Sequence, residues 1–242
     1  MPIRKLQFTP SQFYHIYNRG NARQNIFVND KDRYRFLQAM YLSNNSSSFL
    51  SIEELERNKS GYTLEEIKKI IENNDVNREP LVKICADCLM PNHFHFLLQE
   101  TQESGIIKFM QRLGTSYAKY FAIKYDRPGS LFQGRFKAVH INKDEQLRYM
   151  LAYINVINPA QLAEPHLKEK GIKNMNKVWE KVNNYKWSTH QEYINKRKSI
   201  LTDKGLLKIL YPDPKTYNDF VRNILKDKEQ EFWKKIEKVT ID

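Results

Sequence analysis

Two histidines, His93 and His95, lie one residue apart in the largely apolar stretch LMPNHFHFLLQ (89–99). In a β-strand, residues i and i+2 point to the same face, so both imidazoles project together while Phe94 and Phe96 point to the opposite side. Imidazole is the commonest protein ligand for divalent transition metals, and two on one strand are preorganised for chelation. The pair predicts a metal or catalytic site on a bare face of a sheet; two surface or structurally satisfied histidines are the ordinary alternative.

The elements that must position this pair follow from hydrophobic periodicity. Strands are expected at 13–19, 81–90, 94–99 and 134–141, and helices at 30–44, 105–125 and 143–158. Pro91-Asn92 is a turn dipeptide that joins the middle strands into a hairpin. Asp30 is the candidate N-cap of the first helix, and Pro159 is expected to end the last one. The order βαββαβ followed by a helix predicts an α+β fold with a ferredoxin-like or RRM-like core, a four-stranded antiparallel sheet with helices on one face.

The charge of the chain favours a polyanionic partner. Lys and Arg number 40 against 28 Asp and Glu in 242 residues, a formal net charge of +12. Nucleic acid is the leading candidate partner and an anionic membrane surface the next. No stretch approaches the roughly 20 apolar residues of a membrane span, and the N-terminus lacks the apolar run of a signal peptide, so we expect a cytoplasmic protein without a membrane partner. Two cysteines exclude a disulfide framework of the secreted kind.

The charge is also unevenly distributed. Residues 105–150 carry a net charge of +6, whereas residues 51–80 carry −3. We interpret residues 44–80, which include a short amphipathic helix, as an insertion into a catalytic domain spanning residues 1–165. Residues 166–242 are interpreted as a basic, helical C-terminal extension of that domain.

Five motifs resemble, in order, those of one protein family. They are YHIYNRGNARQNIF near the N-terminus, MPNHFHFLL around the histidines, SLFQGRFKAVHI before the third helix, YINVINP on that helix, and YKWSTHQEY at 185–193. The histidine-hydrophobic-histidine motif is similar to that of the HUH single-strand endonucleases. The whole set, over roughly residues 13–193, resembles the REP-associated tyrosine transposases, single-tyrosine enzymes of the insertion-sequence 200-like type.

The resemblance implies a chemistry. His93 and His95 are expected to bind a divalent ion, Mg or Mn, beside a phosphodiester of single-stranded DNA with hairpin or repetitive palindromic ends. A helix-borne tyrosine attacks phosphorus, giving a 5′-phosphotyrosine and a free 3′-OH, and a later 3′-OH reverses the step. Tyr149 and Tyr153 both lie on the required helix and share a face of it. The family pattern of a tyrosine, an aliphatic residue and then Asn-Pro matches Tyr153.

The third metal ligand departs from the family pattern. Relatives carry Gln or Asn four residues after the tyrosine, but this chain has Ile157, which lacks a donor atom. Asn158 lies about 140° around a regular α-helix from Tyr153. A one-residue π-bulge brings residue i+5 beneath the tyrosine, so we expect Asn158 to complete the set, with Asn155 as a second possibility.

Basic residues near the motifs are candidates for contact with nucleic acid. These are Arg19, Arg23, Arg112, Arg135 and Lys137. Phosphate contact or base stacking is plausible for them, and solvated surface charge is the competing interpretation. For His15 we favour a structural role.

Two rival functions are also compatible with the sequence. Cys85-x-x-Cys88 together with the two histidines is compatible with a structural zinc site, although the cysteines should face opposite sides of their strand. The second rival is an RRM-like single-stranded nucleic-acid-binding protein without catalysis. The long C-terminal extension is similar to that of the REP-associated group, so a monomer is favoured over a dimer.

Overall fold

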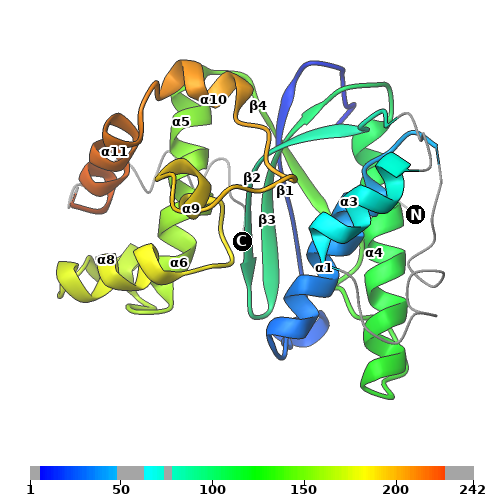
Figure 1. Cartoon of the computed structure of the whole chain (residues 1–242). Coiled ribbons are helices and arrows are strands. Elements are labelled where there is room, and N and C mark those ends of the chain that lie inside the picture. The colour runs from blue at the N-terminus through cyan, green and yellow to red at the C-terminus, as the bar shows by residue number, and fades with distance from the viewer. Residues whose placement is uncertain (1–5, 48–62, 74–77, 227–242) are drawn as a thin grey trace.

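The computed structural model describes residues 6–47, 63–73 and 78–226, and it builds them around a four-stranded antiparallel sheet (Figure 1). The strands are β1 (Phe13–Arg19), β2 (Val82–Met90), β3 (His93–Glu100) and β4 (Lys137–Ile141). Their spatial order is β2-β3-β1-β4, with β1 in the centre beside β3 and β4. This arrangement confirms the α+β, ferredoxin-like core predicted from the order of the elements.

Helices cover both faces of the sheet (Figure 1). One side carries α1 (Asp30–Ser43), α3 (Leu64–Asn73) and α4 (Gly105–Lys124). The other side carries α5 (Asp144–Ala152), α6 (Asn158–Gln161), α7 (Leu167–Lys170), α8 (Met175–Asn184), α9 (His190–Tyr193), α10 (Gly205–Leu210) and α11 (Pro214–Lys226). The prediction of helices on one face only is therefore wrong, because α5, α6 and the chain beyond residue 165 form a second helical layer. Strand β3 shows why both layers are needed: five consecutive residues, from Phe94 to Leu98, are buried, whichever face they point to.

The side of the sheet that faces α1 and α4 is aromatic. Phe94 and Phe96 pack against Phe36 of α1, with ring centroids 5.2 and 6.2 Å away, and Phe96 also meets Phe109 of α4 at 6.3 Å. This aromatic layer is the side opposite the histidines, as the period of two along the strand predicts.

The N-cap of helix α1 lies one residue earlier than predicted. Its N-cap is Asn29 rather than Asp30: the Asn29 side chain accepts a hydrogen bond from the Asp32 amide at 3.2 Å, and the Asp32 carboxylate accepts from the Asn29 amide at 3.1 Å. This reciprocal capping box satisfies two amides that have no partner within the helix. Asp32 is fully buried and also accepts from Lys124 Nζ at 2.5 Å, which ties α1 to α4.

The helix after β4 does not end at Pro159. Helix α5 continues into a π-helical turn, Tyr153–Ile157, and then into α6, in which Pro159 lies in the first turn. In a regular α-helix, residue 159 donates its amide hydrogen to the carbonyl of residue 155, and proline has none to give. The Asn155 carbonyl instead accepts from Ser188 Oγ at 3.3 Å, so the helix passes the proline with that acceptor satisfied.

The C-terminal segment pairs with the outer edge of β2. The Leu89 amide donates to the Trp187 carbonyl at 2.8 Å, and the Asp203 amide donates to the Ile84 carbonyl at 2.9 Å. A strand edge left unpaired is a template for association with other chains, and this segment covers it. The boundary we placed at residue 165 stays a prediction, and residues 227–242 of the extension lie outside the described part of the chain.

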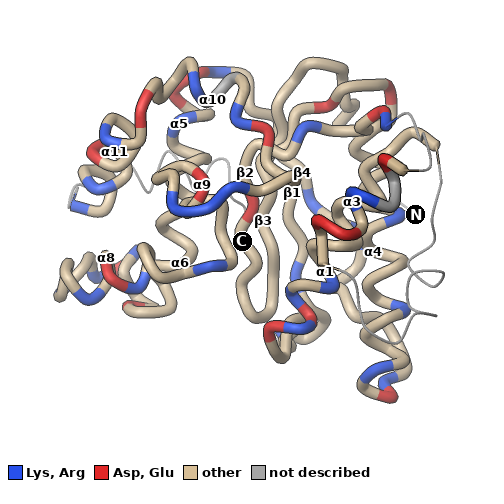
Figure 2. The backbone as a smooth tube through the Cα atoms, in the orientation of Figure 1, with Lys and Arg blue, Asp and Glu red and all other residues tan. Residues whose placement is uncertain are grey.

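Within residues 44–80, the structure describes helix α3, which confirms the predicted amphipathic helix. Ile67 is buried, and α3 carries three glutamates against two lysines (Figure 2). The remainder of that predicted insertion includes residues 48–62 and 74–77, which lie outside the described residues.

Candidate active site

His95 lies in the buried centre of the sheet, between strands and helices. Its position on β3 pairs with Tyr17 of β1, and its side chain is 1 % exposed. The bare sheet face predicted around it is therefore wrong, because the turn Tyr153–Ile157 and its flanking helices cover the imidazole. His93, at the start of the same strand, is half-buried, and the two rings meet edge to face with centroids 5.0 Å apart. The expected juxtaposition of the two imidazoles is present.

The two imidazoles differ in their hydrogen bonds. His93 Nδ1 lies 2.7 Å from Asn92 Oδ1, in the turn that joins β2 to β3. His95 Nδ1 lies 2.8 Å from Nε2 of His15, which is itself fully buried. His95 Nε2 is shielded from solvent, and no group in the described part of the chain forms a hydrogen bond with it. An unpaired buried nitrogen of this kind is costly unless a ligand uses it.

The electrostatic surroundings keep His95 neutral. Burial lowers its pKa well below 6.5, and the neighbouring His93, His15 and Lys168 lower it further. A neutral imidazole keeps a lone pair available, which is the form that coordinates metal ions.

Tyr153 is the tyrosine that faces this cluster. Its ring meets the rings of His95 and His15 edge to face, with centroids 5.4 and 6.0 Å apart, and it is 1 % exposed. Tyr149 lies one turn earlier and packs against Phe220 of α11, with centroids 6.4 Å apart. The sequence placed both tyrosines on one face of the helix, but the structure directs one to the histidines and the other to the C-terminal helix.

The π-helical turn matches the bulge that the sequence analysis invoked. The amide of Asn158 donates to the carbonyl of Tyr153, which is the i to i+5 bond of a π-helix, so residue 158 lies one widened turn after the tyrosine. Asn158 is fully buried; its Oδ1 accepts from Gln161 Nε2 at 3.3 Å, and its Nδ2 has no partner among the described residues. Ile157 is buried and apolar.

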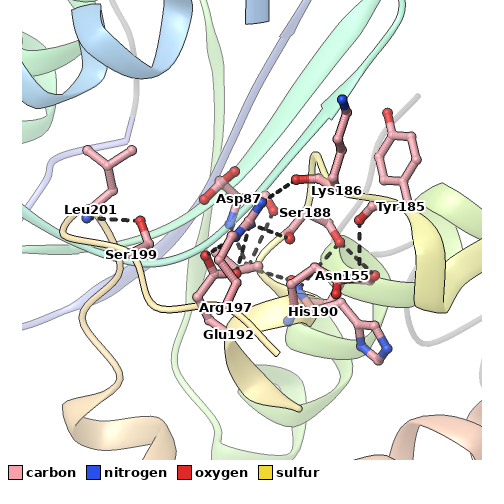
Figure 3. Close-up of polar contacts among 12 residues, drawn as sticks. Asp87, Asn155, Tyr185, Lys186, Ser188, His190, Glu192, Arg197, Ser199 and Leu201 are labelled. Atoms are coloured by element: carbon pink, nitrogen blue, oxygen red, sulfur yellow. Dashed lines mark hydrogen bonds and ion pairs between the residues drawn. The ribbon is translucent and has the colours of Figure 1, made fainter. Parts of the chain in front are cut away.

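Asn155 directs its side-chain amide to the C-terminal segment. It belongs to the polar network drawn in Figure 3. Its Nδ2 donates to the Tyr217 hydroxyl at 3.2 Å and its Oδ1 accepts from Thr189 Oγ1 at 2.6 Å. Both ends of its amide are used to hold the C-terminal segment against the π-helical turn. Asn158 is thus the better placed of the two candidates for a metal.

Four of the five basic candidates gather where β1 ends. Arg19 pairs in register with His93, and its Nε donates to the side chain of Gln133. Lys137 Nζ lies 5.6 Å from the centre of the Tyr17 ring. Arg23 and Arg135 are exposed on the segments that follow β1 and precede β4.

Arg112 lies apart from the other four. Its guanidinium donates to the carbonyls of Asn45 and Ser46, at 2.5 and 3.4 Å, after the end of α1. This is the phenylalanine side of the sheet, so its donors serve the fold there.

Three further residues lie around Tyr153: His15, for which we expected a structural role, and Tyr17 and Lys168, which no motif singled out as site residues. His15 and Tyr17 share a face of β1, and in an antiparallel pair with β3 they meet His95; their rings lie 5.1 and 5.6 Å from it. The alternation FYHIY places His15 and Tyr17 on one face of β1, but only the register between β1 and β3 shows that this face meets His95. Lys168 approaches the Tyr153 hydroxyl, and no motif marks it.

The cysteines do not form a zinc site with the histidines. Cys85 and Cys88 are free, buried thiols, and burial raises the pKa of Cys85 to about 12 and that of Cys88 well above 9. Among the residues that the structure describes, no group of three or more His, Cys, Asp or Glu side chains is arranged to hold a metal. A site built on His93 and His95 therefore needs a ligand of another kind.

Within the same described ranges, no helix has the length and apolar character needed to cross a membrane.

The comparisons with known proteins bear on this site. Residues 56–156 match the family described as "Transposase IS200 like", a range that includes both histidines and Tyr153 but not β1 or Asn158. No curated protein sequence matches the chain.

Two solved structures are similar at a low level. A REP-associated tyrosine transposase bound to a REP hairpin has 14% identity and a TM-score of 0.45, with 84% of this chain and 94% of that chain covered. The tRNA(His) guanylyltransferase of Saccharomyces cerevisiae has 10% identity and a TM-score of 0.33, with 76% and 77% covered. Likenesses of this size do not discriminate between functions.

Proposed function

We propose, from the match of residues 56–156 to the IS200-like transposase family, that the chain is a metal-dependent single-strand DNA endonuclease and strand transferase. The observation that carries the proposal is the position of Tyr153. Of the two tyrosines that the sequence left open, it is the one whose ring lies against His95, whose Nε2 is buried without a partner in the described structure. A nucleophile beside an unpaired imidazole nitrogen is the arrangement that metal-assisted phosphodiester cleavage requires.

Tyr153 is the proposed nucleophile. Its phenolic oxygen attacks phosphorus, the bond from phosphorus to the 3′ oxygen breaks, and the DNA is left as a 5′-phosphotyrosine and a free 3′-OH. The phenolic proton is lost and the departing 3′ oxygen gains one. The phosphotyrosine bond retains the energy of the original phosphodiester, so attack by a second 3′-OH rejoins DNA without an external energy source.

His93 and His95 fit a divalent ion, Mg or Mn, because their two imidazoles lie together and the Nε2 of His95 is buried with no hydrogen-bond partner among the described residues. When bound, the ion supplies Lewis-acid stabilisation of the negative charge on the phosphate. The Asn158 amide is the proposed third protein ligand. Turning that amide over presents Oδ1 where the unpartnered Nδ2 now lies, with Gln161 accepting rather than donating.

His15 orients His95 in this account. Presenting Nε2 to an ion requires the proton of His95 to lie on Nδ1, and His15 Nε2 is placed 2.8 Å away to accept it. A metal-bound histidine ordinarily has such a partner, which fixes both its tautomer and its ring orientation.

The DNA partner is proposed to be single-stranded with a hairpin or palindromic end. Arg19, Arg23, Arg135 and Lys137 supply phosphate contacts near His93, where β1 ends. We further propose that the protein acts in the cytoplasm as a monomer.

A second candidate function is favoured by the burial of the site. Tyr153 and His95 are each 1 % exposed, so a phosphate reaches them only if the covering segments move. A protein in which they stay covered binds single-stranded nucleic acid on its basic residues without cleaving it.

Trapping of a covalent adduct separates the two functions. The protein is incubated with Mn and single-stranded hairpin DNA from the flanks of its own gene, and denaturing gels reveal a protein–DNA adduct. His95→Ala should abolish the adduct while leaving most of the DNA affinity, and His166→Ala, at an exposed position, serves as the matched control. DNA binding without adduct in the unchanged protein supports the binding-only function, and an undiminished adduct in His95→Ala contradicts the metal assignment.

A further inference from the structure

Lys168 lies on the nucleophile side of the proposed site. It belongs to the short helix α7, in the part of the chain that follows the range matched by the transposase family. Its ammonium nitrogen lies 3.4 Å from Tyr153 Oη and 5.0 Å from the centre of the Tyr153 ring. The side chain thus brings a positive charge from the C-terminal segment to the oxygen that the proposed reaction uses.

The contact acts through charge more than through hydrogen-bond geometry. A separation of 3.4 Å is long for a hydrogen bond, so its directional contribution is small. Coulombic attraction falls off more slowly with distance, and it is strengthened where water is excluded. Tyr153 is almost fully buried, and the charge of Lys168 is also felt at His95, where it helps to lower the imidazole pKa.

The reaction places negative charge on this oxygen in both directions. During cleavage the phenol loses its proton as the bond to phosphorus forms. During rejoining that bond breaks and the phenoxide departs. A cation held beside Oη throughout favours both steps, because electrostatic stabilisation of developing charge needs no rearrangement at the moment of reaction.

We propose that Lys168 is a catalytic residue whose ammonium group stabilises the phenoxide of Tyr153 in both cleavage and rejoining. This proposal rests on the proposed function and deepens it, since it assigns part of the catalytic apparatus to the C-terminal extension. Lys168 acts here only as a cation: the proton released by the phenol passes to water, and Lys168 neither gains nor loses one.

Two substitutions separate charge from packing. Lys168→Met keeps an unbranched apolar stem but removes the charge, and Lys168→Arg keeps the charge. The rate of adduct formation should fall about 100-fold in Lys168→Met, the scale of losing one electrostatic stabiliser, and should be largely retained in Lys168→Arg. Lys170→Met, at an exposed position on the same short helix, should behave like the unchanged protein. Equal rates in Lys168→Met and Lys170→Met overturn the proposal.

A second measurement needs neither DNA nor metal. Residue 153 is replaced by 3,5-difluorotyrosine, whose more acidic phenol ionises where a lysine is still protonated, and its ionisation is followed by absorbance. The midpoint should move to higher pH in Lys168→Met and stay in place in Lys170→Met. An unmoved midpoint in Lys168→Met refutes the electrostatic role. Failure of the unchanged protein to form any adduct refutes the proposed function alone, because the titration still reports the interaction of the charges.

The fluorinated tyrosine also tests the role within the reaction. If Lys168 stabilises the phenoxide, the more acidic phenol should recover part of the rate lost in Lys168→Met. A purely structural effect of the substitution gives no such selective recovery.

Discussion

A buried carboxyl group on β2 makes the stability of this protein depend on pH. Asp87 lies beneath the C-terminal segment near Glu192 and Arg197 (Figure 3). Arg197 donates from Nε and one terminal nitrogen to the Glu192 carboxylate, at 2.6 and 2.9 Å. The guanidinium charge is therefore largely compensated by Glu192. Burial, with the added repulsion of Glu192, raises the pKa of Asp87 from 3.8 to about 7.

The sign of the effect follows from proton binding. Between pH 4 and pH 7 the folded protein holds a proton on Asp87 that the unfolded chain has lost, so stability falls as the pH rises through this window. At about 1.4 kcal/mol per tenfold change in proton affinity, this displacement of the pKa corresponds to about 4 kcal/mol above pH 7.

Asp87→Asn removes this penalty, because the amide stays neutral at every pH. We expect the free energy of unfolding to rise by about 2 to 4 kcal/mol at pH 8, since burial of the amide offsets part of the gain. Near pH 4, close to the ordinary pKa of the carboxyl in the unfolded chain, most of the penalty is gone, and the variant and its parent should be nearly equally stable.

Urea unfolding at pH 4 to 9, followed by circular dichroism, measures the difference. Asp219→Asn, at an exposed position of α11, is the matched control and should keep the pH dependence of the parent. An Asp87→Asn variant that is less stable than its parent at pH 8, or that retains the parent's slope between pH 4 and 7, refutes the reasoning.

Two further predictions concern metal and DNA. His15→Leu should weaken Mn binding by about 10- to 100-fold, the scale of losing a histidine's orienting partner, as measured by electron paramagnetic resonance; unaltered affinity excludes an orienting role. Affinity for non-cognate single strands should fall with salt by about 0.7 log units per phosphate contact for each log unit of salt. In fluorescence titrations, Arg135→Ala should make that slope shallower, and a flat dependence in the parent contradicts phosphate-dominated binding.

Local patterns were enough to predict the core of the fold. Alternation along FYHIYNR and FHFLLQ specified strands and their two faces, and the 3.6-residue stripe over 105–125 specified α4. The π-helical turn was anticipated through the family resemblance, which places a ligand at position 157, where this chain has the apolar Ile157 and only a widened turn brings Asn158 beneath Tyr153. These features depend on neighbours within one or two turns of the chain.

The features that sequence analysis missed depend on distant residues. The helical layer over the histidines combines α5, the turn Tyr153–Ile157 and α6 with the chain beyond residue 165, and no local sequence pattern indicates which face of the sheet these segments cover. The helix continues through Pro159 because the hydroxyl of Ser188, 33 residues away from Asn155, donates a hydrogen bond to the Asn155 carbonyl, which proline cannot satisfy. Lys168 is one of many lysines in a basic segment, and its approach to Tyr153 is set by the tertiary path alone. The carbonyls of Asn45 and Ser46 that accept from Arg112 are likewise brought to it by the tertiary fold and marked by no local pattern.

The identity of the nucleophile tests the central claim most directly. The covalent complex formed with hairpin DNA and Mn is digested, and mass spectrometry locates the DNA-linked tyrosine. We predict modification of Tyr153, loss of the adduct in Tyr153→Phe without appreciable loss of binding, and an unchanged adduct in Tyr149→Phe. A DNA-linked peptide modified at Tyr149, whose ring packs against Phe220 in the structure, would contradict the account.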